Sequence, residues 1–266
     1  MSSSDSATPA PSAPLMPPGD ILNWPMLKIV YRTDRERIAA LLPPGIEPGQ
    51  DRRVHITVYN FPVQNEPEYG VVVNVDADWR GQPGLFSLAY GIDQEQAVFV
   101  SQETNGQPKF VCDITYWRML DKVYARCSHQ GYTFLEYEGR AKEVVPNPAE
   151  HTEDEWWLKV SRGAGMGHQQ PTYDFPPQVV HVHSQYGTAY KQRVEGKLRL
   201  IESPWDPIAT HLPVREEPSV HLWWPVFKGR SIALAGKLDP EAFWPFADTI
   251  GGSRWPGRNG GPIKPE

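Results

Sequence analysis

Cysteine is scarce in this sequence of 266 residues, which contains only Cys112 and Cys127. Two thiols so far apart in the chain exclude a disulfide-rich scaffold and a redox-active pair, and we expect both to be buried and free. No apolar stretch reaches the roughly 18 residues of a membrane-spanning helix. Acidic residues outnumber basic ones, 32 to 26, which argues against nucleic acid or an anionic membrane as the main partner. The glycine patterns of phosphate-binding loops are also missing.

The first 18 residues are rich in Ser, Ala and Pro and lack the basic and apolar segments of a secretory signal. We therefore expect a disordered tail over residues 1–20 and a cytoplasmic protein. Residues 251–266 are rich in Gly, Pro and Arg and form a second expected tail. Residues 21–250 contain no clear linker and no internal repeat, so they are predicted to form a single domain.

Proline and glycine are abundant, with 28 and 22 residues respectively, so short strands and loops are expected rather than long helices. Residues 54–61 alternate in the way of a strand with one buried face. About a dozen β-rich stretches follow one another, the run 97–100 among them, and only residues 35–42 and the segment after Asp239 favour helices. Without a βαβ rhythm, the sequence predicts a mainly antiparallel β domain that closes on itself to remove its edge strands.

One lysine has unusual neighbours. Lys109 follows Pro108 and precedes an apolar run that begins at Phe110, whereas most surface lysines lie among polar residues. An ammonium held against apolar surface loses hydration, and its pKa falls. A lysine that is partly a free amine near neutral pH is a nucleophile for ketones. The alternative is an ordinary lysine whose stem covers apolar surface and whose ammonium stays in water.

Four groups of short motifs occur in the order of a known family. They are Ile29-Val-Tyr-Arg-Thr-Asp34 with Leu41-Leu-Pro-Pro-Gly-Ile-Glu47, Val100-Ser-Gln-Glu103 with Pro108-Lys109, Trp156-Trp-Leu-Lys-Val160, and Lys197-Leu-Arg-Leu200 with Ser203-Pro-Trp-Asp-Pro-Ile208 and Leu212-Pro-Val214. Over residues 22–247 the chain resembles the acetoacetate decarboxylase superfamily. In that family the segment matching Pro108-Lys109 supplies a lysine that forms a Schiff base, itself the standard example of a desolvated lysine nucleophile. The resemblance assigns this role to Lys109.

The resemblance also implies a fold. Its members are mainly β, with a closed, cone-shaped antiparallel β-barrel, an additional sheet and a few peripheral helices, and they assemble into homo-oligomers. We expect the same architecture and assembly here.

The chain departs from the decarboxylases at several positions. A second lysine follows the nucleophile in that family, whereas this chain has Phe110. Desolvation, to which Phe110 would contribute, would then have to lower the lysine pKa. Two family glutamates fall at Val71 and near Ile56 or Thr57, and Trp24 replaces an arginine. The carboxylates that handle the substrate are therefore absent where the resemblance would place them.

These departures favour the superfamily members that resemble aldolases with dehydratase activity. We expect a lyase that acts on a pyruvate-like 2-oxo acid and an aldehyde through a Lys109 Schiff base. Decarboxylation of an acetoacetate-like β-keto acid through the same imine is the first alternative. A non-catalytic protein that holds a small molecule in the same fold is the second. No cofactor is expected.

The expected catalytic residues are Lys109 and Glu103, with Glu103 as a proton shuttle in the same segment. Five residues are expected to bind the substrate: Gln102, Tyr69, Phe110, Trp24 and Arg32. Tyr69 would act as an acid or base, and the Gln102 amide would bind a carboxylate. The alternative for Arg32 is a structural ion pair with Asp34 or Glu47.

His181 and His183 are two residues apart and would share one face of a strand, a spacing that occurs in metal sites of β-sheets. No third ligand lies near them in the sequence. We therefore expect ordinary strand histidines and no metal. The expected partners are a small oxo acid and an aldehyde, with no nucleic acid and no membrane.

Overall fold

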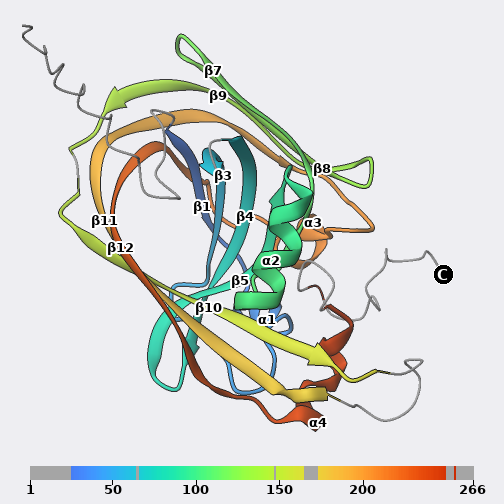
Figure 1. Ribbon diagram of the computed structural model, residues 1–266. Helices are drawn as coiled ribbons and strands as arrows, with labels where there is room; N and C mark the ends of the chain where they lie inside the picture. The colour runs from blue at the N-terminus through green and yellow to red at the C-terminus, as the bar shows by residue number, and fades with distance from the viewer. Residues whose placement is uncertain (1–24, 64–65, 147, 165–172, 250–254, 256–266) are drawn as a thin grey trace, which may run out of the picture.

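The computed structural model describes residues 25–63, 66–146, 148–164, 173–249 and 255 (Figure 1). Most of these residues lie in strands, which confirms the mainly β fold class. The strands are β1 (Met26–Arg32), β2 (Glu47–Pro48), β3 (Arg53–Val63), β4 (Glu66–Trp79), β5 (Gln82–Ile92), β6 (Lys109–Val111), β7 (Asp113–Met119), β8 (Lys122–His129), β9 (Tyr132–Val144), β10 (His151–Arg162), β11 (Tyr173–Leu200) and β12 (Ser219–Lys237). The helices are α1 (Arg35–Ala39), α2 (Glu95–Asn105), α3 (Ile208–His211), α4 (Pro240–Phe243) and the 3-10 helix η1 (Trp244–Thr249).

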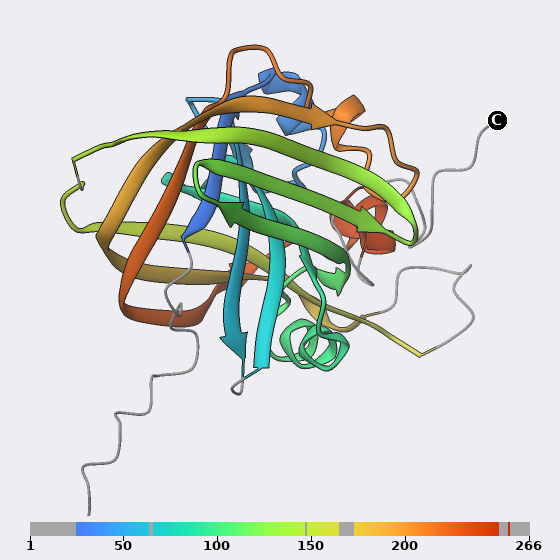
Figure 2. The ribbon, with the colours of Figure 1, turned by 90° about the horizontal axis from the view of Figure 1, so that it is seen from above.

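Seven of these strands close into a ring. Hydrogen-bonded neighbours follow the order β10, β5, β4, β3, β1, β12 and β11, and β11 pairs again with β10. Every pair in the ring is antiparallel except β10 with β5, a parallel contact of Glu155 with Leu85 and Trp156 with Phe86. Strands β9, β8 and β7 continue from β11, and β7 contacts β3, β4 and β5, so these strands fold back over one side of the ring (Figure 2). The predicted antiparallel sheet and its closure are confirmed.

Strand β3 separates two environments inside the fold. Val54 and Ile56 are fully buried in the main hydrophobic core, whereas His55 and Thr57 line a pocket. Successive side chains of a strand point to opposite faces, so the alternation predicted for residues 54–61 is confirmed. Its polar face lines the pocket.

The strand expected at residues 97–100 is wrong. These residues lie in helix α2, where Val98 is buried but Phe99 is 62% and Val100 65% exposed. A run of four apolar residues without alternation has no single strand face to bury, so periodicity alone does not distinguish the two structures. The helix predicted over residues 35–42 forms only over α1, before Pro43-Pro44. The helix predicted after Asp239 is confirmed as α4. The Asp239 carboxylate caps it by accepting hydrogen bonds from the Glu241 and Ala242 amides.

Cys112 and Cys127 are free and buried, as predicted. Trp255 is also buried, and its indole nitrogen donates a hydrogen bond to Asp206 at 3.0 Å. The rest of the segments predicted as tails, residues 1–20 and 251–266, lies outside the described residues, so the domain boundaries stay predictions. Within the described ranges no helix has both the length and the apolar character needed to cross a membrane.

Candidate active site

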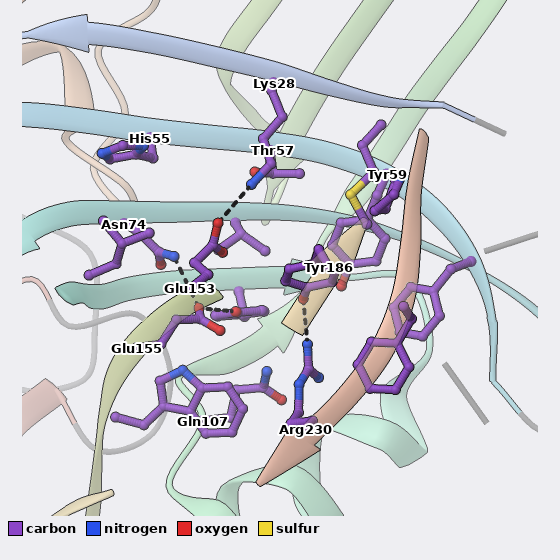
Figure 3. Close-up of a pocket in the computed structure, with 18 of the residues that line it drawn as sticks. Lys28, His55, Thr57, Tyr59, Asn74, Gln107, Glu153, Glu155, Tyr186 and Arg230 are labelled. Carbon is purple, nitrogen blue, oxygen red and sulfur yellow. Dashed lines mark hydrogen bonds and ion pairs between the residues drawn. The ribbon is translucent and has the colours of Figure 1, made fainter. Parts of the chain in front are cut away.

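A cavity of about 270 Å³ lies within the strand ring (Figure 3). All seven ring strands contribute side chains to its wall, together with Asn105, Gln107 and Lys109 from the segment that joins α2 to β6. The volume is near the lower end of small-molecule pockets, which begin at about 300 Å³. The cavity therefore suits a small organic molecule.

The local fold delivers Lys109 to this wall. Gly106 caps the C-terminal end of helix α2, and its φ of 69° lies in the left-handed region. A Cβ at this position would come within 2.3 Å of the Leu158 carbonyl oxygen, so only glycine lets the chain pass so close to β10. Pro108 follows, and its carbonyl accepts a hydrogen bond from the Tyr90 amide at 2.9 Å. Strand β6 then begins at Lys109, paired with Tyr90 of β5.

Lys109 faces a buried carboxylate. Its Nζ atom lies 3.6 Å from Glu68 Oε2, and the two side chains are only 9% and 0% exposed. The other oxygen, Glu68 Oε1, accepts a hydrogen bond from the Tyr59 hydroxyl at 3.2 Å. Oε2 itself makes no hydrogen bond within the described part of the chain. Tyr59 thus holds the carboxyl group with one oxygen directed at the amine.

Burial shifts both pKa values toward the uncharged forms. It lowers the pKa of Lys109 and raises the pKa of Glu68, because little water remains to stabilise either charge. The attraction between the two charges opposes these shifts but does not cancel them. Each group is therefore uncharged over a wider pH range than it would be in water.

A second buried carboxylate lies on β10. Glu155 Oε1 accepts hydrogen bonds from the Tyr90 hydroxyl at 2.8 Å and from the Asn74 side-chain amide at 3.1 Å. Burial, helped by the nearby charge of Glu153, raises the pKa of Glu155. A carboxylate with a raised pKa is a stronger general base than an ordinary glutamate.

Two cationic side chains complete the polar part of the wall. Lys28 Nζ lies 3.6 Å from Glu153 Oε2 (Figure 3). Arg230 donates hydrogen bonds to the Tyr186 hydroxyl and to Ser184 Oγ, each at 2.9 Å. Among the described residues, no carboxylate forms an ion pair with Arg230. Its guanidinium is therefore available to bind a carboxylate of a ligand.

Aromatic rings supply much of the remaining wall. Tyr90 and Trp157 pack edge to face with ring centroids 6.0 Å apart, and Tyr186 and Trp223 do so at 5.4 Å. Tyr59 and Tyr90 also belong to a small buried apolar cluster with Trp157. This lining favours a ligand that carries an apolar or aromatic group beside its polar atoms.

Of the four site residues predicted between positions 102 and 110, one lines the cavity and three do not. Lys109 lines the cavity, but the neighbouring Phe110 points into the main core, 4.3 Å from the His129 ring. The Gln102 side-chain amide donates to the Lys109 carbonyl oxygen, so it holds the segment and is not among the cavity-lining residues. Glu103 is exposed on α2 and does not line the cavity.

The other predicted residues lie away from the amine. Tyr69 is half-buried against the main core, and it is not among the cavity-lining residues. Arg32 is exposed and pairs with Glu216 at 3.1 Å, so its expected structural partners, Asp34 and Glu47, are not the ones it uses. Asp34 binds Arg215 instead. The predicted site residue Trp24 lies outside the described residues.

The carboxylates Glu68 and Glu155 and the cation Arg230 are among the pocket residues that had not been predicted. The sequence signal for Glu155 is its place in β10, where Glu153, Glu155 and Trp157 alternate with residues of the opposite face. Glu68 lies in the same segment as Val71, the position where a family glutamate was expected and not found. The pocket therefore contains carboxylates, although they come from positions other than those first considered.

The fold and the site define a class of protein, one in which a closed ring of strands surrounds a cavity with a buried amine and buried carboxylates in its wall. Residues 5–237 match the model of the family described as acetoacetate decarboxylase (ADC). The chain belongs to this family.

Solved structures with the same fold share little sequence with this chain. An acetoacetate decarboxylase superposes with a TM-score of 0.66 at 13% identity, over 80% of this chain and 86% of the other. The acetoacetate decarboxylase of Legionella pneumophila subsp. pneumophila str. Philadelphia 1 gives 0.63 at 15% identity, over 88% and 93%. The enduracididine biosynthesis enzyme MppR complexed with pyruvate gives 0.59 at 16% identity, over 78% and 87%. A search of curated protein sequences gave no match.

Proposed function

We propose that this chain is a Schiff-base lyase that joins a small 2-oxo acid to an aldehyde through Lys109. The observation that carries the proposal is the burial of the Lys109 amine at 3.6 Å from Glu68 in a cavity of small-molecule size. Family membership supports an enzyme of this type. The fold that the chain shares with MppR, one of whose structures holds pyruvate, supports a 2-oxo acid as the substrate.

In the first step the free amine of Lys109 attacks the ketone carbon of the oxo acid. Glu68, as the carboxylic acid, donates a proton to the carbinolamine oxygen, which leaves as water and gives a protonated imine. Arg230 binds the substrate carboxylate through charge-assisted hydrogen bonds. The amine and the proton donor are adjacent before the substrate arrives, so the step needs little rearrangement.

In the second step the protonated imine withdraws electrons from the adjacent carbon. Glu155, whose pKa burial raises, takes a proton from that carbon and gives an enamine. The enamine carbon attacks the aldehyde carbon, and the protonated Glu155 returns its proton to the aldehyde oxygen. Loss of this hydroxyl as water and hydrolysis of the imine release an unsaturated 2-oxo acid and restore the amine. The aromatic wall provides the surface for an apolar aldehyde.

Decarboxylation of a β-keto acid is the second candidate, and one observation favours it. Two buried carboxyl groups belong to the cavity: Glu68 lies next to the Lys109 amine, and Glu155 lines the wall. The protonated imine accepts the electron pair when the carbon–carboxylate bond breaks, and nearby negative charge disfavours the substrate carboxylate relative to neutral carbon dioxide. The shared fold with two acetoacetate decarboxylases supports this reaction as well.

Two product assays on the purified full chain decide between the candidates. In one, pyruvate is mixed with an aromatic aldehyde and the conjugated product is followed by its ultraviolet absorption. In the other, acetoacetate is supplied and carbon dioxide is measured. We expect the condensation to proceed and to stop in Lys109→Met, while the exposed Lys122→Met variant keeps wild-type activity. Carbon dioxide release alone would favour the decarboxylase, and neither product would favour a non-catalytic binding protein. Assembly into homo-oligomers stays a prediction.

A further inference from the structure

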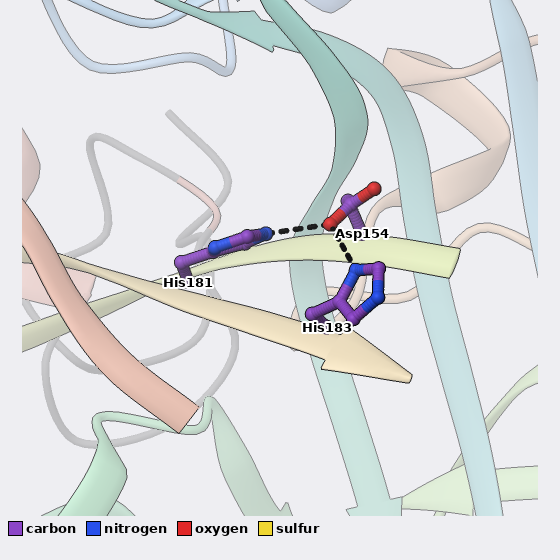
Figure 4. Close-up of side chains that lie close together, drawn as sticks. All are labelled: Asp154, His181 and His183. Atoms are coloured by element: carbon purple, nitrogen blue, oxygen red, sulfur yellow. Dashed lines mark hydrogen bonds and ion pairs between the residues drawn. The ribbon is translucent and has the colours of Figure 1, made fainter. Parts of the chain in front are cut away.

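A second cluster of chemically active side chains lies on the outer face of β10. Glu153 and Glu155 point into the cavity, so Asp154 between them points to the opposite side of the strand. His181 and His183 lie on the neighbouring strand β11, where Asp154 pairs with His183 and Trp156 with His181. Figure 4 shows both imidazole rings directed at the Asp154 carboxylate. The third ligand that the sequence did not reveal therefore comes from the paired strand.

The three side chains converge on one point. Asp154 Oδ1 lies 2.6 Å from His181 Nε2 and 2.9 Å from His183 Nδ1. One ligand atom from each residue lies within 4.8 Å of the other two. Zinc binds imidazole nitrogen and carboxylate oxygen at about 2.0–2.2 Å, so ligand atoms around one ion are about 3 Å apart. A small displacement of the three groups would admit an ion between them.

Backbone pairing and ring packing hold the cluster in place. The His181 ring stacks on the Trp156 indole, with ring centroids 4.6 Å apart and planes 27° apart. Because all three ligands lie on two hydrogen-bonded strands, little conformational freedom would be lost on binding. The side chains of Asp154, His181 and His183 are 23%, 26% and 32% exposed. This exposure leaves an entry path and positions for water.

We propose that Asp154, His181 and His183 form a binding site for one divalent transition-metal ion of the zinc type. Two imidazoles and one carboxylate are ligands that suit such ions. Each neutral imidazole would move its proton to the other ring nitrogen, and the Asp154 oxygen would exchange two hydrogen bonds for a metal bond. The ion would clamp β10 to β11, the pair that completes the strand ring. This proposal does not depend on the chemistry of Lys109.

Zinc titration of the metal-free full chain tests the proposal, with a competing chelator and calorimetric detection. We expect one high-affinity ion per chain. His183→Gln and Asp154→Asn should each weaken zinc binding at least about 10-fold. Substitution of residues that only hydrogen-bond to metal ligands already lowers metal affinity by about 10–100-fold. His221→Gln is the matched control, since His221 is a half-buried strand histidine on β12 outside the cluster, and it should bind zinc as the wild type does.

Two further readouts separate lost ligands from lost folding. Zinc should raise the thermal unfolding midpoint of the wild type and of His221→Gln, because an ion that binds only the folded chain stabilises it. It should leave the midpoint of a His181→Gln/His183→Gln double variant unchanged, although the metal-free variant unfolds cooperatively. Cobalt should give a visible absorption band with the wild type and none with the double variant. Absence of binding, or equal affinity in wild type and cluster variants, would overturn the proposal.

Discussion

Lys109 Nζ lies 3.6 Å from Glu68 Oε2, and the two side chains are 9% and 0% exposed to solvent. In water such a pair would be two charges, but burial lowers the pKa of the lysine and raises the pKa of the glutamate. Both shifts bring the two pKa values closer together than those of an exposed lysine and glutamate. In the proposed reaction this pair would act first as nucleophile and acid and later as leaving group and base.

Glu68→Gln should slow imine formation by about 100-fold or more, because general acid catalysis contributes about 10²–10⁴-fold. The amide keeps the size of the side chain but has no acidic proton to give to the carbinolamine oxygen. The measurement is the rate of ketone adduct formation at one pH. Glu103→Gln, which changes an exposed glutamate of α2, should form the adduct at the wild-type rate. If Glu103→Gln slowed adduct formation more than Glu68→Gln does, the sequence-based prediction of Glu103 as the proton shuttle would be supported instead.

The Lys109→Met/Glu68→Gln double variant should be at least as stable as the wild type. Lys109 has a lowered pKa, so its folding cost is present at every pH below the usual lysine pKa. Glu68 has a raised pKa, so its cost is present above the usual glutamate pKa, and both costs act at neutral pH. Replacing buried charged pairs with uncharged groups is often neutral or stabilising by about 1–4 kcal/mol. Urea unfolding at neutral pH measures this, and a loss of several kcal/mol would mean that the pair supports the fold.

Arg230→Gln should weaken the use of 2-oxo acids more than the use of simple ketones. Hydrogen bonds to charged groups contribute about 1.5–3 kcal/mol, so kcat/KM for pyruvate should fall by about 10–100-fold. A ketone without a carboxylate should be trapped by the variant as efficiently as by the wild type. Equal losses for both compounds would show that Arg230 supports the pocket rather than the substrate carboxylate.

Gly106→Ala should destabilise the chain and reduce trapping at Lys109. The new Cβ would meet the Leu158 carbonyl oxygen at 2.3 Å, in addition to the strain of a φ of 69°. Gly131 offers a matched control, because its φ is 82° but nothing lies within 4 Å of a Cβ there. Gly131→Ala should lose only about 1 kcal/mol from backbone strain. Similar losses of stability in the two variants would show that the close approach to β10 does not explain the glycine at position 106.

Local pattern predicted much of the fold but less of the site. The alternation at residues 54–61 and the absence of βαβ units were sufficient for a closed, mainly antiparallel sheet, because burial of one strand face dictates that pattern. Residues 97–100 failed because a short apolar run fits a helix as well as a strand. In the helix, Glu103 faces solvent, which removes it from the cavity.

Among the predicted site residues that the structure describes, only Lys109 lines the cavity. Three other charged residues of the cavity wall, Glu68, Glu155 and Arg230, come from strands β4, β10 and β12. Which side chains meet depends on strand register and on closure of the ring, and neither can be read from local periodicity. The same reason hid the approach of Asp154 to His181, since the strand pairing brings them together.

Borohydride trapping followed by peptide mass spectrometry tests the central claim most directly. The wild-type chain is incubated with pyruvate and reductant over a range of pH, and the modified lysines are identified. We predict a covalent adduct at Lys109 already near neutral pH. The lowered pKa of Lys109 gives a larger fraction of free amine at that pH than in an ordinary lysine, whose pKa is about 10.4. The exposed Lys122 is the internal comparison and should carry less label than Lys109. No adduct at Lys109 with pyruvate or acetoacetate, or labelling that follows Lys122, would contradict a Schiff base at this site.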